Sequence, residues 1–481
     1  MKINFIIPPE EHFIESYVTK KLDKGREFRQ KLGILWVAGY LRQELGITPN
    51  IIDSIADSLK LEDIQKTIVQ EEPDIVGFSV LTFNILDCIE VAKMIKTVSP
   101  QTKIVFGGFH PSLYPVETLA LDGVDLVVFG EGELTFTDLV KAMLKHPEGN
   151  LRDEAFGNVD GLAWTDRNGV SHVNNPRKPP HSKNLDYLSL PAHDLVNLEK
   201  YTVVLANESR VAAIQTSRGC PSRCTFCDIR LTKHRHRGTD HVMKELTMLK
   251  ERGIREFFVV DDTFTIDRDR VIELCKRMVK ENLNIPYKIS SRVDRVDPEL
   301  LDYLAASGCY SIHYGVESGT QRILDYMQKG VTLDQVRETF KNTHAAGIKP
   351  FAYLMMGVPT ETLEDINRTI DFVDEIKPEY LNYSICTPFP KTYLYENARK
   401  EGEIDEDYWL EFAKRPDPNF KVKVLNQHLT EHELRKLQDK AIRRFYFKPS
   451  RIVKEIKKTR DLKQLIVKTR IGLRLMMPRF G

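Results

Sequence analysis

The amino-acid sequence predicts an α/β protein with two parallel sheets and a helical C-terminal part. Short apolar runs alternate with amphipathic segments over the first 147 residues, and the same alternation returns between residues 206 and 400. Strands and helices that alternate with short loops are typical of parallel sheets with helical crossovers. A length of 481 residues exceeds one ordinary hydrophobic core, so we expect more than one domain.

The first region, 1–147, contains five strand-like runs. They read "INFIIPP", "PNIIDSI", "DIVGFSV", "KIVFGG" and "VDLVVFG". Helices are predicted at "LGILWVAGYLRQELG", which should stop at Gly46, and at "ILDCIEVAKMIKTV" and "LTFTDLVKAMLKH". This order predicts a Rossmann-like, flavodoxin-like domain, in which ligands bind at the carboxyl ends of the strands.

The second region, 206–400, holds six strand-like runs with helix-like segments between them. The runs are "AAIQTS", "EFFVVDD", "PYKISSR", "SIHYGVES", "KPFAYLMMGV" and "YLNYSICTPF". Because a closed TIM barrel needs eight βα units, six units predict a partial (β/α)6 barrel of the TIM type. The polar, Pro-rich segment 148–205, with a hairpin pattern around Asn168-Gly169, is predicted to be a connector. Residues 401–481 are charged and predicted to be helical.

Composition excludes several classes of protein. Hydrophobic residues make up 41% of the chain, charged residues 29%, and the net charge is +1, so wholesale nucleic-acid binding is not expected. No apolar run reaches the roughly 18 residues of a membrane span, and the N-terminus is a poor signal peptide. Four of the seven cysteines lie singly, which favours a reducing, cytoplasmic compartment.

The other three cysteines crowd into "RGCPSRCTFCD", directly after the first strand of the second region. Cys220, Cys224 and Cys227 have the spacing C-x3-C-x2-C. A chance core cluster is improbable because the turn is polar, and a closed zinc site would need His234 or His236 as a fourth ligand. Three thiolates can instead hold a 4Fe–4S cluster that leaves its fourth iron open.

This spacing, with an aromatic residue before the third cysteine, resembles the radical S-adenosylmethionine (SAM) superfamily. The segments "FVVDDTFT", "SSRVDRVDPELLDYLAASGC", "GVESGTQRIL" and "GVPTET" resemble successive strand–loop segments of the subgroup that also binds cobalamin. The resemblance covers about residues 1–395. It implies a cobalamin-binding domain at 1–147 and a radical SAM barrel at 206–400. It also implies that SAM binds the open iron and is cleaved by one electron to a 5′-deoxyadenosyl radical.

Several residues at the strand ends of the barrel are candidates for binding SAM. Glu317 and Ser318 can contact its ribose and amino acid end, and Arg292 can pair with its carboxylate. A structural ion pair between Arg292 and Glu317 is the alternative. Asp261 can bind the sulfonium side or the substrate, while helix capping by Asp262 is equally expected. The sequence names no catalytic residue beyond these binding groups.

Candidate cobalamin residues follow two strands of the first region. They are Ser79, Thr82, Gly107, Gly108 and His110, whose loops resemble corrinoid-domain loops. The D-x-H-x-x-G motif of many cobalamin domains is absent, which is common in this subgroup. Two alternatives stay open: the domain is a scaffold without a ligand, and His110 is a loop-packing residue.

Three features depart from a plain reading of the family. Lys391 stands where a glycine is expected in "TPFPKTYLYE". A glycine there would permit positive φ, which lysine does not favour. We expect the Lys391 side chain to lie in solvent, and the alternative is contact with an acidic group on the substrate. Cys386 is predicted to be a buried core thiol rather than a hydrogen-atom donor. The segment 441–481 carries thirteen Lys and Arg against two acids, which suits either contact with an anionic membrane surface or an ordinary capping helix.

The resemblance leaves three functions to compare. The first is a cobalamin-dependent radical methyltransferase that methylates an unactivated carbon of a small or lipid-like substrate, with a flavodoxin- or ferredoxin-type electron donor. The second is a cyclase or rearrangement enzyme like the anaerobic magnesium-protoporphyrin monomethyl ester cyclase, which transfers no methyl group. The third, a non-catalytic iron–sulfur electron carrier, is disfavoured because carriers surround their clusters with a complete ligand set. The expected location is cytoplasmic, with peripheral contact at the inner membrane face only if the tail binds lipid.

Overall fold

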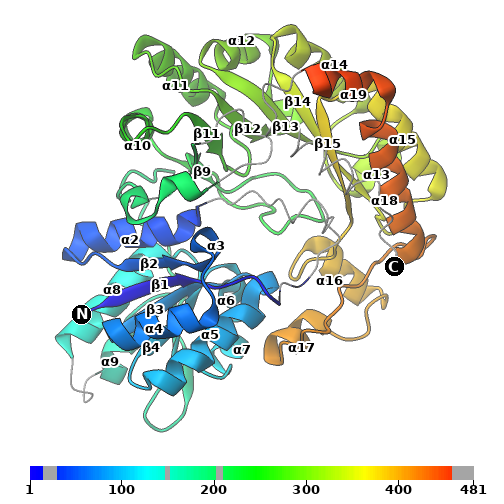
Figure 1. The fold of residues 1–481 in the computed structure, drawn as a ribbon. Coiled ribbons are helices and arrows are strands. Elements are labelled where there is room, and N and C mark those ends of the chain that lie inside the picture. The colour runs from blue at the N-terminus through cyan, green and yellow to red at the C-terminus, as the bar shows by residue number, and fades with distance from the viewer. Residues whose placement is uncertain (13, 15–29, 147–151, 182, 202–209, 458–481) are drawn as a thin grey trace.

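The computed structural model describes residues 1–12, 14, 30–146, 152–181, 183–201 and 210–457 of the chain. Figure 1 shows an N-terminal α/β domain beside a second sheet with helices on its outer side. The C-terminal helices, orange to red, run from the edge of the first domain along the outside of the second sheet. This arrangement confirms the predicted α/β class with a helical C-terminal part.

The first sheet has the strand order β2-β1-β3-β4-β5-β6-β7. Its first five strands are parallel, and 2-1-3-4-5 is the flavodoxin-like order that the sequence predicts. β6 and β7 form the predicted hairpin, and β6 pairs antiparallel with β5, so the sheet extends past residue 147 into the predicted connector. The strands are β1 (Ile3–Ile7), β2 (Asn50–Asp53), β3 (Ile75–Ser79), β4 (Lys103–Gly107), β5 (Leu126–Val128), β6 (Leu162–Thr165) and β7 (Ser171–Val173).

Helices cover both faces of this sheet. The helix predicted to stop at Gly46 does so, because Gly46 adopts φ +69° and its N–H bonds back to the carbonyl of Arg42. Inside the same helix, a Cβ on Gly39 would lie 2.3 Å from the carbonyl of Leu190, so glycine lets the connector pack close. The helices are α2 (Leu32–Leu45), α3 (Ser54–Asp57), α4 (Leu61–Glu71), α5 (Ile85–Val98), α6 (Phe109–Leu113), α7 (Pro115–Leu119), α8 (Gly132–Lys145) and α9 (Arg152–Gly157).

The second sheet is the predicted partial barrel. Its six strands are all parallel and lie in chain order from β8 to β15, and the two edge strands do not pair. On β13, Ile312, Tyr314 and Val316 join the core beneath the helices, so the alternate residues face the barrel interior. The strands are β8 (Val211–Ile214), β11 (Glu256–Val259), β12 (Tyr287–Ser291), β13 (Cys309–Glu317), β14 (Lys349–Met356) and β15 (Tyr380–Ile385). The helices are α10 (Thr239–Glu251), α11 (Arg268–Lys280), α12 (Pro298–Ala306), α13 (Gln321–Tyr326), α14 (Leu333–Ala345) and α15 (Leu363–Ile376).

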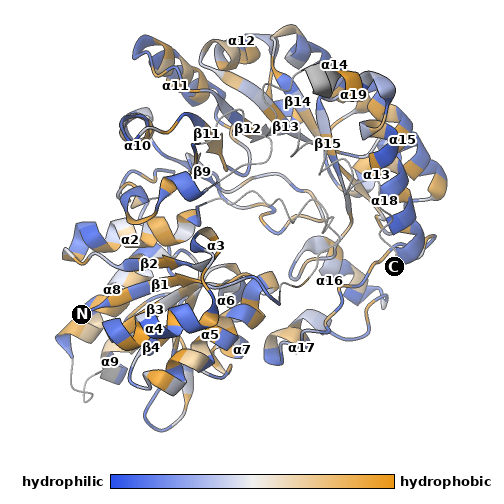
Figure 2. Cartoon of the chain, viewed as in Figure 1, coloured by the Kyte–Doolittle hydropathy of each residue, from blue (hydrophilic) through white to orange (hydrophobic). Residues whose placement is uncertain are grey.

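The C-terminal part comprises α16 (Tyr393–Lys400), α17 (Tyr408–Lys414), α18 (Glu431–Tyr446) and α19 (Pro449–Lys457). α18 buries an apolar face against β15 and keeps a polar outer face, which Figure 2 draws mostly in blue. Arg444 and Lys448 form ion pairs with Asp371 and Asp374 of α15. The described part of the basic segment therefore caps the barrel, while 458–481 lies outside the described residues. No helix in the described part of the chain is long and apolar enough to cross a membrane.

Lys391 corrects one expectation from the sequence. It adopts φ +62°, although a non-glycine residue in this region costs about 1 kcal/mol or more. Its side chain is exposed, as expected, and its Nζ lies 5.6 Å from the centre of the Tyr114 ring. Cys386 is buried, as expected of a core thiol.

Ion pairs join the two domains where β5 ends. Glu133 Oε1 lies 2.5 Å from Arg218 Nη2, and Glu131 Oε2 accepts a hydrogen bond of 3.1 Å from Arg235. Trp36 of α2 packs beside this cluster, with its ring 5.5 Å from the Arg218 guanidinium carbon. Burial alone would raise the pKa of Glu131, but the two arginines hold it below its usual value. We call these four charged residues the interdomain clamp.

We predict that Glu133→Gln destabilises the protein by about 1.5–3 kcal/mol, because it leaves Arg218 with a weaker partner in a mostly buried contact. The measurement is thermal or denaturant unfolding of the full chain. Asp138→Asn is the matched control, because Asp138 lies on the same helix as Glu133 and forms a more exposed ion pair, with Arg177. Its loss should cost less than about 1 kcal/mol. Equal losses in the two variants would show that the clamp adds no more than a surface pair.

Candidate functional site

The three clustered cysteines lie in a loop whose base is a two-residue antiparallel ladder. β9 (Ser217–Arg218) precedes the loop and β10 (Arg235–His236) follows it, with Arg218 opposite Arg235. Gly219 opens the loop at φ +87°, and a Cβ there would lie 2.4 Å from the carbonyl of Lys233. Glycine is therefore required at the position just before Cys220.

Hydrogen bonds hold the loop against two other elements. The N–H of Thr225 donates to the carbonyl of Met327, and the carbonyl of Thr225 accepts from Leu394, each at 2.9 Å. The N–H of Cys220 donates to the hydroxyl of Thr232 at 2.8 Å. The backbone that carries the thiols is thus fixed by the end of α13 and the start of α16.

Asp261, at the end of β11, anchors the start of the loop. Its carboxylate accepts from the N–H of Thr216 at 2.6 Å, from the Thr216 hydroxyl at 2.5 Å and from the Ser217 hydroxyl at 2.7 Å. The side chain is buried. The structure therefore gives Asp261 a positioning role, and direct contact with SAM or substrate stays a prediction.

Asp262 does not cap a helix, so that alternative was wrong. Its carboxylate accepts from the N–H of Gly219 at 2.8 Å, while Asp267 caps the following helix α11. Both acids after β11 therefore bind the segment that leads to the cysteines.

The thiols sit at different depths. Cys220 and Cys224 are buried, while Cys227 is partly exposed. Burial raises the pKa of Cys227 to about 12, and Asp228 and the other two thiols add to the effect. A free Cys227 thiol would be protonated at neutral pH, so a metal or nearby cations are needed to hold it as a thiolate.

The cations are present beside Cys224. Arg292 Nη1 lies 3.6 Å from the Cys224 Sγ, and Arg292 also donates to the carbonyl of Lys329 at 2.6 Å. Burial opposes the charge on Lys329, but Glu317 and Cys224 raise its pKa, so it stays charged. Such cations offset the negative charge of a thiolate-bound cluster.

In the described part of the chain, no fourth ligand completes a closed zinc site at the cysteines. Within the described residues, the group of three or more His, Cys, Asp or Glu whose ligand atoms lie within 4.8 Å of one another is found in the first domain, not at the cysteines. His236 instead lies 3.5 Å from Asp267. Three thiols, adjacent cations and a missing fourth ligand fit a 4Fe–4S cluster with one open iron.

Arg292 and Glu317 do not pair with each other, contrary to the alternative above. Arg292 pairs with Asp294 at 2.8 Å, and Glu317 pairs with Lys329 at 2.8 Å. Glu317 follows a β-bulge and adopts φ +66°. A Cβ on Gly315 would lie 2.4 Å from Glu317 Oε1, so this glycine makes room for the strained carboxylate.

Ser318 is also engaged within the chain. Its hydroxyl lies 3.2 Å from the hydroxyls of Thr320 and Thr369, and the residue is fully buried. Of the three candidate SAM residues, Arg292 contacts the cysteine loop through Cys224, and Glu317 pairs with the neighbouring Lys329. Their contacts with SAM stay predictions.

The candidate cobalamin residues meet at the carboxyl edge of the first sheet. Ser79 pairs with Gly107, and Gly108 adopts φ +105° where a Cβ would lie 2.9 Å from the carbonyl of Val80. The hydroxyl of Thr82 lies 3.1 Å from Nδ1 of His110.

His110 is fully buried, and burial lowers its pKa to about 4, so the imidazole is neutral. Its packing beside Tyr114 agrees with the loop-packing alternative. Its Nε2 has no hydrogen-bond partner in the described part of the chain. A close backbone edge and an orphaned buried nitrogen fit a large polar ligand above this edge.

Comparisons with known proteins agree with this architecture. A family model described as the radical SAM superfamily matches residues 214–373, and one described as the B12 binding domain matches residues 28–140. An uncharacterized methyltransferase of Pyrococcus horikoshii is 32% identical over 95% of both chains.

The chain belongs to the cobalamin-binding radical SAM family. An anaerobic magnesium-protoporphyrin IX monomethyl ester cyclase of Rubrivivax gelatinosus is 27% identical and covers 86% of this chain and 75% of its own. The solved structure of the cobalamin-dependent SAM radical enzyme OxsB, with aqua-cobalamin and SAM bound, has a TM-score of 0.73 at 18% identity, covering 98% of this chain and 71% of that one. That likeness confirms the fold.

Membership in the cobalamin-binding radical SAM family makes the chain an enzyme and implies three cofactors: a 4Fe–4S cluster, SAM and cobalamin. The reading of the chain as a non-catalytic electron carrier was therefore wrong. Methyltransferases and cyclases both occur among its relatives, so the family alone does not decide between these reactions.

Sequence reasoning missed Glu361, in the "GVPTET" segment. This carboxyl is fully buried; one oxygen accepts from the N–H of Gly357 at 2.6 Å, and the other has no partner among the described residues. Burial raises its pKa to about 8, although two backbone N–H groups partly oppose the shift. The sequence signal that could have indicated it is the spacing of Glu361 four residues after Gly357, at the end of a predicted strand.

We predict that Asp261→Asn lowers the iron and sulfide bound per chain after anaerobic reconstitution. The asparagine amide keeps one acceptor oxygen, but its NH2 group faces the Thr216 N–H or the Ser217 hydroxyl, which also donate. The lost hydrogen bond destabilises the start of the loop by about 1.5–3 kcal/mol. Asp297→Asn is the matched control, because Asp297 caps α12 away from the cysteines. Wild-type iron content in Asp261→Asn would remove the positioning role.

We predict that Glu361→Gln flattens the pH dependence of stability between pH 6 and 8. The folded carboxyl keeps its proton up to about pH 8, whereas the unfolded one, with an ordinary pKa near 4.5, has already released it. Wild-type stability should therefore fall as pH rises, by up to about 1.4 kcal/mol per pH unit, and become level above pH 8. Unfolding temperatures at pH 6, 7 and 8 measure this, and parallel profiles for the two proteins would contradict it.

Proposed function

We propose that the protein transfers a methyl group from SAM to an unactivated carbon of a small or lipid-like substrate. The observation that carries the proposal is the interdomain clamp. Arg218 pairs with Glu133 at the start of α8 in the cobalamin domain and stands two residues before Cys220. The clamp therefore holds the carboxyl edge of one cofactor domain against the cysteine loop of the other.

The bound cofactors would supply one-electron cleavage of SAM, for hydrogen removal from the substrate, and a cobalt centre that carries the methyl group. The chain supplies distance and charge. Cys220, Cys224 and Cys227 would hold the cluster, Arg292 and Lys329 would balance its charge, and Gly107 and Gly108 would let the corrin approach the backbone.

An external reductant is part of this proposal. Cys227 is partly exposed, so one side of the cysteine loop is open to a donor of the flavodoxin or ferredoxin class. All seven cysteines are free, which agrees with a reducing, cytoplasmic compartment. Contact of the tail with a membrane surface stays a prediction for 458–481.

The second candidate is cyclisation or rearrangement without methyl transfer. The likeness to the magnesium-protoporphyrin cyclase over 86% of the chain favours it. Methyl transfer is preferred because the methyltransferase relative is more similar and spans 95% of both chains.

We predict that an anaerobic assay with SAM carrying a CD3 group gives a product three mass units heavier than the product from ordinary SAM, together with 5′-deoxyadenosine and S-adenosylhomocysteine. Mass spectrometry of candidate-substrate mixtures measures all three. A Cys224→Ala variant is the control and should form none of them. Production of 5′-deoxyadenosine with no labelled product and no S-adenosylhomocysteine would favour the cyclase instead.

A further inference from the structure

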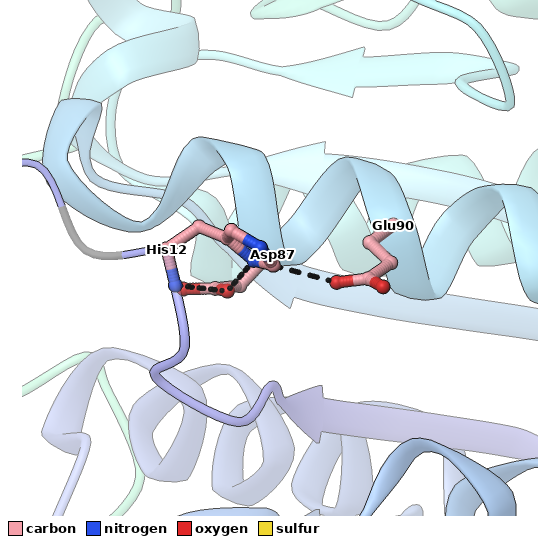
Figure 3. Close-up of side chains that lie close together, drawn as sticks. All are labelled: His12, Asp87 and Glu90. Carbon is pink, nitrogen blue, oxygen red and sulfur yellow. Dashed lines mark hydrogen bonds and ion pairs between the residues drawn. The ribbon is translucent and has the colours of Figure 1, made fainter. Parts of the chain in front are cut away.

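A compact group of one imidazole and two carboxylates lies in the first domain, apart from the cysteine loop. His12 belongs to the segment after β1, while Asp87 and Glu90 stand one turn apart on α5. Figure 3 shows the three side chains gathered at this face of α5. Nδ1 of His12 lies 3.1 Å from Asp87 Oδ1 and 3.5 Å from Glu90 Oε2.

These separations suit a metal ion. Nitrogen and oxygen ligands bind first-row divalent ions at about 2.0–2.2 Å, so neighbouring ligands around one ion lie about 3.0–3.5 Å apart. All three ligand atoms lie within 4.8 Å of one another. The three ligand atoms are therefore spaced like neighbouring ligands around one metal ion.

An independent observation points to a missing cation. Asp87 is buried, with 2% of its side chain exposed, yet its Oδ2 has no hydrogen-bond partner in the described part of the chain. Its Oδ1 already accepts from the N–H groups of Glu11 and His12. Among the described residues, His12 is the basic group paired with either carboxylate, and it carries charge only when protonated. A buried carboxylate oxygen without a partner is costly unless a ligand completes it.

The group is accessible to ions from solvent and lies at a particular edge of the first sheet. His12 and Glu90 are about half exposed, so an ion can reach the buried Asp87 from solvent. In this strand order, the edge between β1 and β3 is the switch point of the sheet. Ile14 donates to the carbonyl of Phe83, whose ring packs 5.9 Å from Phe389 of the barrel, so the segment also lies near the domain interface.

We propose that His12, Asp87 and Glu90 bind a divalent transition-metal ion that ties the segment after β1 to α5. One imidazole and two carboxylates suit Mn²⁺, Fe²⁺ or Zn²⁺, with water in the remaining positions. The ion neutralises the buried carboxylate and fixes the entry to the cobalamin domain. This role is separate from the cluster site and does not depend on methyl transfer.

The test uses the tag-free full chain, reconstituted with its cluster and cobalamin and freed of loosely bound metal. Mn²⁺ is titrated, and the loss of its six-line electron paramagnetic resonance spectrum gives the bound fraction. Wild type should bind one more equivalent than His12→Gln or Glu90→Gln. Each variant should bind Mn²⁺ at this site at least about 10-fold more weakly than wild type. Loss of a residue that only supports a metal ligand already costs about 10- to 100-fold in metal affinity.

His172→Gln is the matched control, because His172 pairs with Asp166 at 3.0 Å without a third ligand and should leave binding unchanged. Circular dichroism of every variant checks that the fold is retained, and both substituted ligands are exposed enough for this to be expected. Absence of Mn²⁺ binding at millimolar concentration, or wild-type affinity in His12→Gln or Glu90→Gln, would overturn the proposal.

Discussion

The interdomain clamp is the contact on which the arrangement of the two cofactor domains depends. Glu131 and Glu133 begin α8 of one domain, and Arg218 and Arg235 form the base of the cysteine loop in the other. Charged hydrogen bonds of this kind are stronger when water is excluded, and Glu133 is almost fully buried. Two domains that carry separate cofactors are useful to each other only at a fixed distance. The sequence places the acids and the arginines about 85–104 residues apart, and folding brings them together.

Hydrogen bonds within the chain hold the cysteine loop in place. Asp261 and Asp262 accept four hydrogen bonds from residues 216–219, and Thr225 joins the loop to two later helices. Each bond to a carboxylate is worth about 1.5–3 kcal/mol when its partner would otherwise be buried alone. A loop fixed by such bonds loses less conformational entropy when it binds a cluster. Glu317, which pairs with Lys329, adopts φ +66°, and this costs about 1 kcal/mol or more.

Buried ionisable groups recur around both candidate sites. Arg292 and Lys329 adjoin the thiols, Glu361 closes the turn after β14, and Asp87 keeps an unpaired oxygen beneath His12. Buried ionisable groups with specific partners cluster at functional sites more often than in structural cores. The first two groups belong to the cluster side of the molecule, and the third belongs to the opposite domain.

The sequence by itself determined the order of strands and helices, the three clustered thiols and the family, because these depend on local periodicity and on short spacings. It also named Arg292, Glu317 and Ser318 as candidates, since the ends of parallel strands face the substrate side of a barrel. Only the tertiary structure decided which charges pair. Arg292 pairs with Asp294, and Glu317 pairs with Lys329. Asp261 accepts hydrogen bonds from the segment that leads to the cysteine loop. Which buried charges pair depends on the distance between them in the folded protein and on the cost of removing each from water. Neither quantity can be read from the spacing of residues in the sequence.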